Sequence, residues 1–121
     1  MITFDTWIFN IRDSLEKLSD LDFQLQAWVK GTKFSGGWYE EVSTLYDSHC
    51  FEEFLSKHKD SDKLPNEAYL KLLEFHNHMD DYDGKENDAD IVNDPVWKKI
   101  TLIGKEAIAI MDKFNIKGKL D

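Results

Sequence analysis

The stretch HNHMDDYDGKENDADIVNDP, residues 76–95, is the densest group of side chains in the chain that could do chemistry. It sets two histidines beside seven carboxylates, with Lys85 as the one basic residue among them. Such a set could ligate a metal ion, or it could stay a solvated acidic loop. It could also pair with the lysines and arginines of a basic partner.

Metal binding is the first of these possibilities. His76 and His78 are two positions apart, so on a helix they point about 200° away from each other. His76 and Asp80 are four apart and share a face, but no second helix offers a matching Glu-x-x-His sequence. Aligning Gly84 with the glycine of a calcium-binding loop places Met79 where that loop needs an acid. We therefore expect no metal and no other cofactor.

Nucleophilic chemistry has even weaker support in the sequence. Cys50 is the only cysteine, and its neighbour His49 would face a different way on a helix. No serine lies in the strained turn that exposes a catalytic nucleophile. We expect a protein that is not an enzyme. The alternative is a small metal-dependent enzyme or metal-binding helical protein that uses His76, Asp80 and the acidic loop.

A partner surface is the interpretation that we favour for the acidic segment. Like charges at this density destabilise the compact state locally, and no structural role for them is evident that would offset this loss of stability. Trp and Tyr dominate interface hot spots, so aromatic residues near the acids or beside the glycine-rich loop at 31–37 could anchor a partner, although core packing remains open for them. The candidate binding residues are Asp80, Asp81, Asp83, Glu86, Asp88, Asp90, Trp38, Tyr39 and Tyr82. Residues that could extend this surface are Glu40, Glu41, Asp47, Glu52 and Glu53.

The overall charge favours the same class of partner. The chain has 24 acidic and 15 basic residues, a formal charge of −9. This balance argues against direct nucleic-acid binding, which needs a basic face, and against docking on anionic lipid. No apolar run approaches the roughly 20 residues of a membrane span. Asp5 and Asn10 interrupt the apolar start, so we expect no secretory signal and a cytoplasmic protein.

Apolar residues recur at helical spacing along most of the chain, and sustained period-2 alternation is absent. We expect helices at 4–18, 21–29, 38–46 and 51–58, and a fifth that begins at Pro65 and ends near Gly84. The sequence DADIV, residues 88–92, could form one further helical turn. The last helix should start at Asp94–Pro95 and end at Gly118, with Val96 on its apolar stripe and Trp97 off it. The prediction is one all-α domain over 1–121, a compact bundle of five to six helices.

Three short stretches resemble a known class of proteins: QAWVKG (26–31), STLYDSHCFEEFL (43–55) and NDADIVNDPVWKKI (87–100). Their order is similar to that in the small acidic all-helical immunity proteins encoded beside bacterial polymorphic toxins, including those of contact-dependent growth inhibition. The resemblance implies a non-enzymatic inhibitor that binds its cognate toxin domain in the cytosol and blocks the toxin's active site. Many such toxins are nucleases with basic clefts. No catalytic residues carry over from the resemblance.

Overall fold

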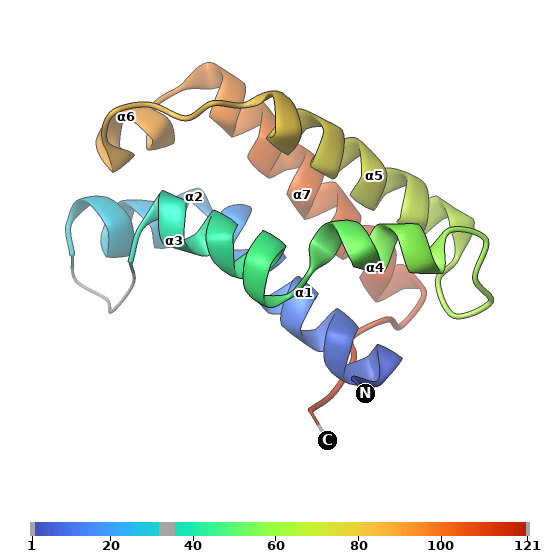
Figure 1. Ribbon diagram of the computed structural model, residues 1–121. Helices are drawn as coiled ribbons and strands as arrows, with labels where there is room; N and C mark the ends of the chain where they lie inside the picture. Colours follow the sequence, from blue (N-terminus) through green and yellow to red (C-terminus); the bar gives the residue numbers. More distant parts are fainter. Residues whose placement is uncertain (1, 32–35, 121) are drawn as a thin grey trace.

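The computed structural model describes residues 2–31 and 36–120, and every regular element in them is helical (Figure 1). The predicted glycine-rich loop at 31–37 therefore lies partly outside the described residues. The α-helices are α1 (Phe4–Leu18), α2 (Leu21–Gln24), α3 (Trp38–Ser43), α4 (Phe51–His58), α5 (Asn66–Asp81), α6 (Asp88–Val92) and α7 (Pro95–Lys113). Two π-helical turns, η1 (Leu25–Val29) and η2 (Thr44–Ser48), continue α2 and α3. The all-α prediction is confirmed.

The described residues contain seven α-helices, which corrects the expected five to six. The additional helix is α6, which forms from the sequence DADIV in the acidic segment. The Asn87 side chain starts it by accepting a hydrogen bond from the Asp90 amide at 2.9 Å. The acidic segment is thus partly helical and not a loop throughout.

The start of α7 follows the sequence prediction, but the side chain that its first turn buries does not. Asp94 caps the helix by accepting the Val96 amide at 3.0 Å, and Pro95 is the first helical residue. Trp97 is fully buried, whereas Val96 is 57% exposed, so the predicted roles of these two residues were reversed. The inward-pointing indole of Trp97 has a buried partner, because its Nε1–H donates to Gln24 Oε1 at 2.8 Å.

The end of α7 also differs from the prediction. The helix stops at Lys113, before Gly118 where its end was expected, and Asn115 beyond it adopts the left-handed conformation. The Ile116 amide donates to the Met111 carbonyl at 2.7 Å and the Asn115 amide to the Asp112 carbonyl at 3.0 Å. This is the Schellman pattern, in which asparagine can replace glycine.

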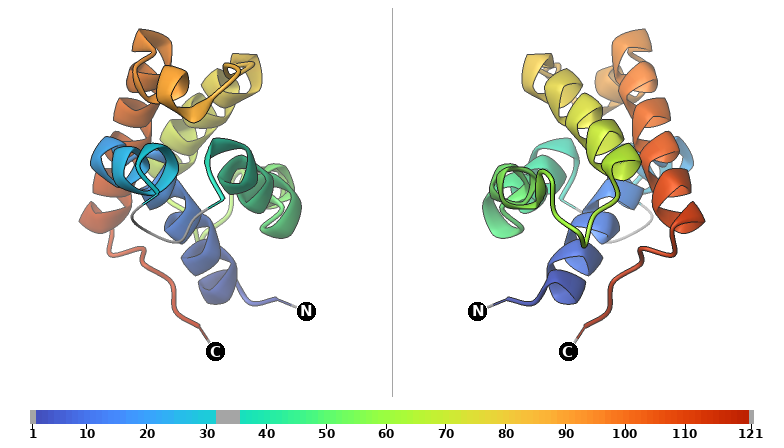
Figure 2. Two further views of the ribbon diagram at one scale, coloured as in Figure 1. Left: turned by 90° about the vertical axis from the view of Figure 1, so that its left-hand side faces the viewer. Right: turned by 90° about the vertical axis from the view of Figure 1, so that its right-hand side faces the viewer.

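The helices pack around a core to which α7 and α1 contribute much of the buried surface. α5 and α7 run side by side in opposite directions, and α1 packs against α7 (Figures 1 and 2). α3, η2 and α4 form a second layer that crosses α1, and α4 reaches α5. α6 lies against η1 and the start of α7. None of the described helices has the length and apolar character that crossing a membrane requires.

Candidate functional site

The predicted partner-binding residues fall into two groups in the structure. Six of the nine are exposed: Asp80, Asp81, Asp83, Glu86, Asp90 and Tyr39. Tyr39 stands out among them, because 77% of this large ring is open to solvent. The other three, Trp38, Tyr82 and Asp88, are half-buried. The structure therefore separates residues that can meet a partner directly from residues that hold the surface in place.

Asp88 belongs to the second group. Its Oδ1 atom accepts a hydrogen bond from the Trp38 amide at 3.3 Å. A Cβ atom added to Gly37 would lie only 2.6 Å from Asp88 Oδ2, so this approach depends on glycine. The contact joins the first residue of α6 to the start of α3. Asp88 thus positions the acidic segment and has less of its charge available for a partner.

Trp38 and Tyr82 form an aromatic cluster with Trp97. The ring of Tyr82 stacks on Trp97 at a centroid distance of 5.5 Å, and Trp38 meets both rings edge-on at 6.0 and 6.2 Å. Gly84 lies so close to Trp38 that an added Cβ would be 2.9 Å from the indole ring. The cluster joins α3, the end of α5 and the start of α7. Of the three predicted aromatic anchors, only Tyr39 is open to a partner.

Asp94 is the innermost carboxylate of the acidic segment. The Tyr82 hydroxyl donates to Asp94 Oδ2 at 2.8 Å, and Lys85 Nζ lies 3.7 Å from the same oxygen. The Tyr82 hydrogen bond, then the Val96 amide and Lys85, lower the pKa of Asp94. Burial, followed by the bond to Asp94, raises the pKa of Tyr82 above its usual value.

This arrangement decides how much charge the segment shows to solvent. Lys85 is its one lysine, and that lysine forms its ion pair with Asp94. In the described part of the chain, the exposed carboxylates Asp80, Asp81, Asp83, Glu86 and Asp90 have no ion-pair partner. Their negative charge is therefore available to a partner outside the chain.

The second acidic stretch covers residues 36–56, which contain five carboxylates and no lysine or arginine. These carboxylates are Glu40, Glu41, Asp47, Glu52 and Glu53. Tyr46 of η2 links this stretch to α5: its pKa is raised by burial first, and then by the negative charges of Glu52 and Asp80. One phenol thus lies within the field of carboxylates from both α4 and α5. The two acidic stretches meet at this point of the fold.

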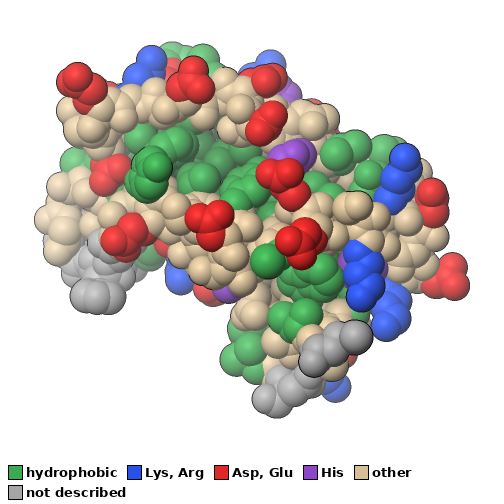
Figure 3. Space-filling model, in the orientation of Figure 1, with side chains coloured by type: hydrophobic (Ala, Val, Ile, Leu, Met, Phe, Trp, Pro, Cys, Tyr) green, Lys and Arg blue, Asp and Glu red, His purple; other side chains and the backbone are tan. Residues whose placement is uncertain are grey.

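The charge of the whole molecule is concentrated in these two segments. Residues 72–97 contain eight carboxylates and one lysine, and together with 36–56 they account for more than the entire net charge of −9. The rest of the chain has eleven acidic and fourteen basic residues. Figure 3 shows acidic side chains on both sides of a band of hydrophobic ones across one side of the molecule. We call the exposed carboxylates of the two segments, with Tyr39, the acidic face.

His76, the metal ligand in the alternative prediction, is engaged by a different residue. Its Nδ1 atom lies 2.8 Å from the Tyr46 hydroxyl, and its ring packs against Tyr46 and Phe51. No hydrogen bond or ion pair joins His76 to Asp80 among the described residues. Within 2–31 and 36–120, no three His, Cys, Asp or Glu side chains come together in a way that could hold a metal ion.

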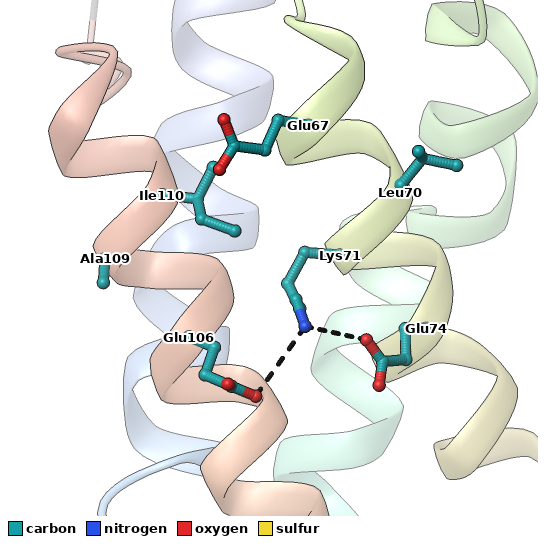
Figure 4. A pocket seen from close by; sticks show the side chains of 7 residues that line it. All are labelled: Glu67, Leu70, Lys71, Glu74, Glu106, Ala109 and Ile110. Carbon is teal, nitrogen blue, oxygen red and sulfur yellow. Dashed lines mark hydrogen bonds and ion pairs between the residues drawn. The ribbon is translucent and has the colours of Figure 1, made fainter.

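A groove of about 590 Å³ lies elsewhere, between α5 and α7 (Figure 4). Leu70, Ala109 and Ile110 give it an apolar lining. Lys71 Nζ lies 2.9 Å from Glu74 and 3.8 Å from Glu106. The hydrogen bond to Glu74 raises the pKa of Lys71, so the amine stays protonated, whereas a nucleophilic lysine needs a lowered pKa. The groove offers no activated nucleophile.

The comparisons with known proteins found no matching family model, no matching curated protein and no matching solved structure.

Proposed function

We propose that the protein is an immunity-type inhibitor, which binds a cognate toxin domain in the cytoplasm and blocks the toxin's active site without catalysing a reaction. The acidic face would make the contact, and the partner would be basic, with a nuclease domain as the best fit. The observation that supports this proposal most directly is the separation of charge. Exposed carboxylates from two distant segments share one side of the molecule, and the described chain supplies them with no basic partners.

The chemistry of a nuclease cleft explains why such a face would suit it. A cleft that binds a nucleic-acid backbone presents lysines and arginines at the spacing of phosphates. Carboxylates from 36–56 and 72–97 can form charge-assisted hydrogen bonds with the same side chains. The field of the acidic face would speed the encounter, and Tyr39 could bury its exposed ring against the partner. The resemblance to small acidic immunity proteins points to the same conclusion.

The experiment starts with finding the partner. The tagged protein is incubated with an extract of the organism that encodes it, the bound proteins are eluted with stepwise increases in salt, and they are identified by mass spectrometry. The captured domain is then purified, and its enzymatic activity is measured with and without the protein. We expect a basic enzyme domain whose activity is abolished at a one-to-one ratio. Binding without any loss of activity would contradict the proposed inhibition.

A matched pair of triple variants tests the site. D80N/D83N/E86Q removes three exposed charges from the acidic face, and D22N/D60N/D62N removes three exposed charges elsewhere. We expect the first variant to bind the captured domain at least about tenfold more weakly, and the second to change binding by less than about threefold. Equal weakening by both variants would show that only the net charge matters. No weakening by the first variant would rule out this site.

A further inference from the structure

A second cavity lies where the N-terminal end of α1 meets the C-terminal end of α4. Its volume is about 480 Å³, and the rings of Phe4, Trp7 and His58 line it together with Ile2. The ring of His58 lies 4.9 Å from that of Phe4 and 5.9 Å from that of Trp7, edge-on in both cases. The lining therefore combines aromatic and apolar side chains with the polar side chains of Thr3 and Ser61 and two lysines, and small-molecule sites likewise join an apolar surface to a few polar groups.

Two lysines border this aromatic cavity. Lys57 Nζ lies 5.9 Å from the centroid of the Trp7 ring, and Lys63 Nζ lies 6.0 Å from that of Phe4. Neither lysine forms an ion pair with another described residue, although the protein has an excess of acids. In Figure 3, basic side chains lie near the end of α4, with acidic side chains to either side of them.

The positive charges of Lys57 and Lys63 also act on His58, which lines the cavity. His58 is only 6% exposed, and its pKa is lowered by burial first and then by the charges of Lys57 and Lys63. Its Nδ1 atom lies 3.2 Å from Ser61 Oγ, which also accepts the Lys63 amide at 3.1 Å. When the Ser61 hydroxyl donates to Nδ1, the neutral ring keeps its proton on Nε2 as a donor for a ligand.

The N-terminus of α1 adds to this field. α1 has 15 residues, and its capping residue Thr3 lines the cavity, so the positive end of the helix dipole is nearby. Asp5 borders an adjoining hollow with Lys63 and limits the negative charge that the region can accept. With Asp5 beside the adjoining hollow and with Asp60 and Asp62 flanking Ser61 in the sequence, the two lysines suit a singly charged anion better than a doubly charged one.

We propose that this cavity binds a small monocarboxylate with an apolar or aromatic body. The carboxylate would lie between the ammonium groups of Lys57 and Lys63, and the body would pack on the rings of Phe4, Trp7 and His58. The site uses none of the residues of the acidic face. It therefore stands or fails independently of the proposed inhibitor function.

Phenylacetate is a suitable probe, and phenylacetamide is its neutral counterpart of nearly the same shape. Each compound is titrated into ¹⁵N-labelled full-length protein, and chemical shifts are followed by NMR up to about 10 mM, which detects a Kd of about 1 mM. We expect saturable shifts with phenylacetate, centred on Phe4, the Trp7 indole and Ser61. Phenylacetamide should bind at least about tenfold more weakly. Absence of saturable shifts with phenylacetate, or equal binding of both compounds, would overturn the proposal.

The lysine variants distinguish binding in the cavity from attraction by the overall charge of the protein. K57Q/K63Q should weaken phenylacetate binding by at least about tenfold, whereas K98Q/K99Q, which removes two exposed lysines of α7, should leave it unchanged. All four lysines are exposed, so both variants should fold. Equal weakening by the two variants would show non-specific attraction and would also overturn the proposal.

Discussion

Asp94 and Asp83 belong to the same acidic segment, but they have different surroundings. Asp94 is buried, accepts hydrogen bonds from Tyr82 and Val96, and pairs with Lys85. Asp83 is exposed and has no ion-pair partner in the described chain. The first stabilises the fold and the second remains available for binding, so substitutions at the two positions should affect different measurements.

Asp94 makes stability depend on pH in the acidic range. Its pKa in the folded protein is below the ordinary aspartate value of 3.8, mainly because of the Tyr82 hydrogen bond. The ionised carboxylate therefore stabilises the fold fully above pH 3.8, and this contribution is lost as the pH falls towards the folded pKa. We expect Asp94→Asn, which can still cap α7, to unfold at a lower temperature than the wild type at pH 7.

The difference between Asp94→Asn and the wild type should shrink as the pH falls below about 3.8. Thermal unfolding followed by circular dichroism between pH 2.5 and 7 measures it. Asp83→Asn serves as the control and should not show this loss of stability at pH 7. A gap between Asp94→Asn and wild type that stays constant over the whole range would refute the role of the charge.

At the scale of elements, close approach of the loop at 82–87 to α3 holds the acidic face together. Gly84 has a φ of +80° and lies against the Trp38 ring. The loop can follow this path because glycine tolerates the left-handed conformation and leaves room for the indole. The same contact keeps the exposed carboxylates beside the second acidic stretch.

A pair of glycine substitutions distinguishes the cost of backbone strain from the cost of a clash with Trp38. Gly31→Ala meets nothing within 4 Å and adds only the strain of a positive φ, about 1 kcal/mol. Gly84→Ala adds similar strain and also a clash with Trp38, so it should lower the free energy of unfolding by about 2–4 kcal/mol. Urea unfolding measures both. Equal losses for the two variants would show that the contact with Trp38 does not matter.

At the scale of the whole molecule, the acidic face should reduce stability. The exposed carboxylates of 36–56 and 72–97 repel one another, and none of them has an ion-pair partner in the described chain. Repulsion between exposed charges is screened over about 3 Å at 1 M salt, compared with about 30 Å at 0.01 M. The midpoint of thermal unfolding should therefore rise as salt is added at neutral pH.

The triple variants of the binding experiment test this repulsion as well. At about 0.01 M salt, D80N/D83N/E86Q should unfold about 2–5 °C above the wild type, and the gain should largely vanish near 1 M salt. D22N/D60N/D62N removes the same charge from other positions and should gain less. If D80N/D83N/E86Q unfolds at the wild-type temperature in low salt, repulsion within the acidic face does not reduce stability.

The helical class and most of the helix positions could be predicted from the sequence, because apolar residues at helical spacing and local caps depend on near neighbours. The stripe from Phe4 to Leu18 and the cap at Asp94–Pro95 are examples. Which side chain the first turn of α7 buries was less predictable, because Trp97 packs and bonds with residues that are distant in sequence, such as Gln24. The π-helical turn at η2 likewise departs from the period on which such patterns rest.

The candidate site could likewise be predicted only in part from the sequence. The sequence by itself determined that the protein is acidic, that the acids cluster in short segments, and that Tyr39 and Asp83 are candidates for contact. Only the tertiary structure decided which candidates stay free, because Asp88 bonds to the start of α3 and Trp38 and Tyr82 pack on Trp97. Composition and spacing describe each segment alone, whereas exposure and pairing depend on which distant segments the fold brings together.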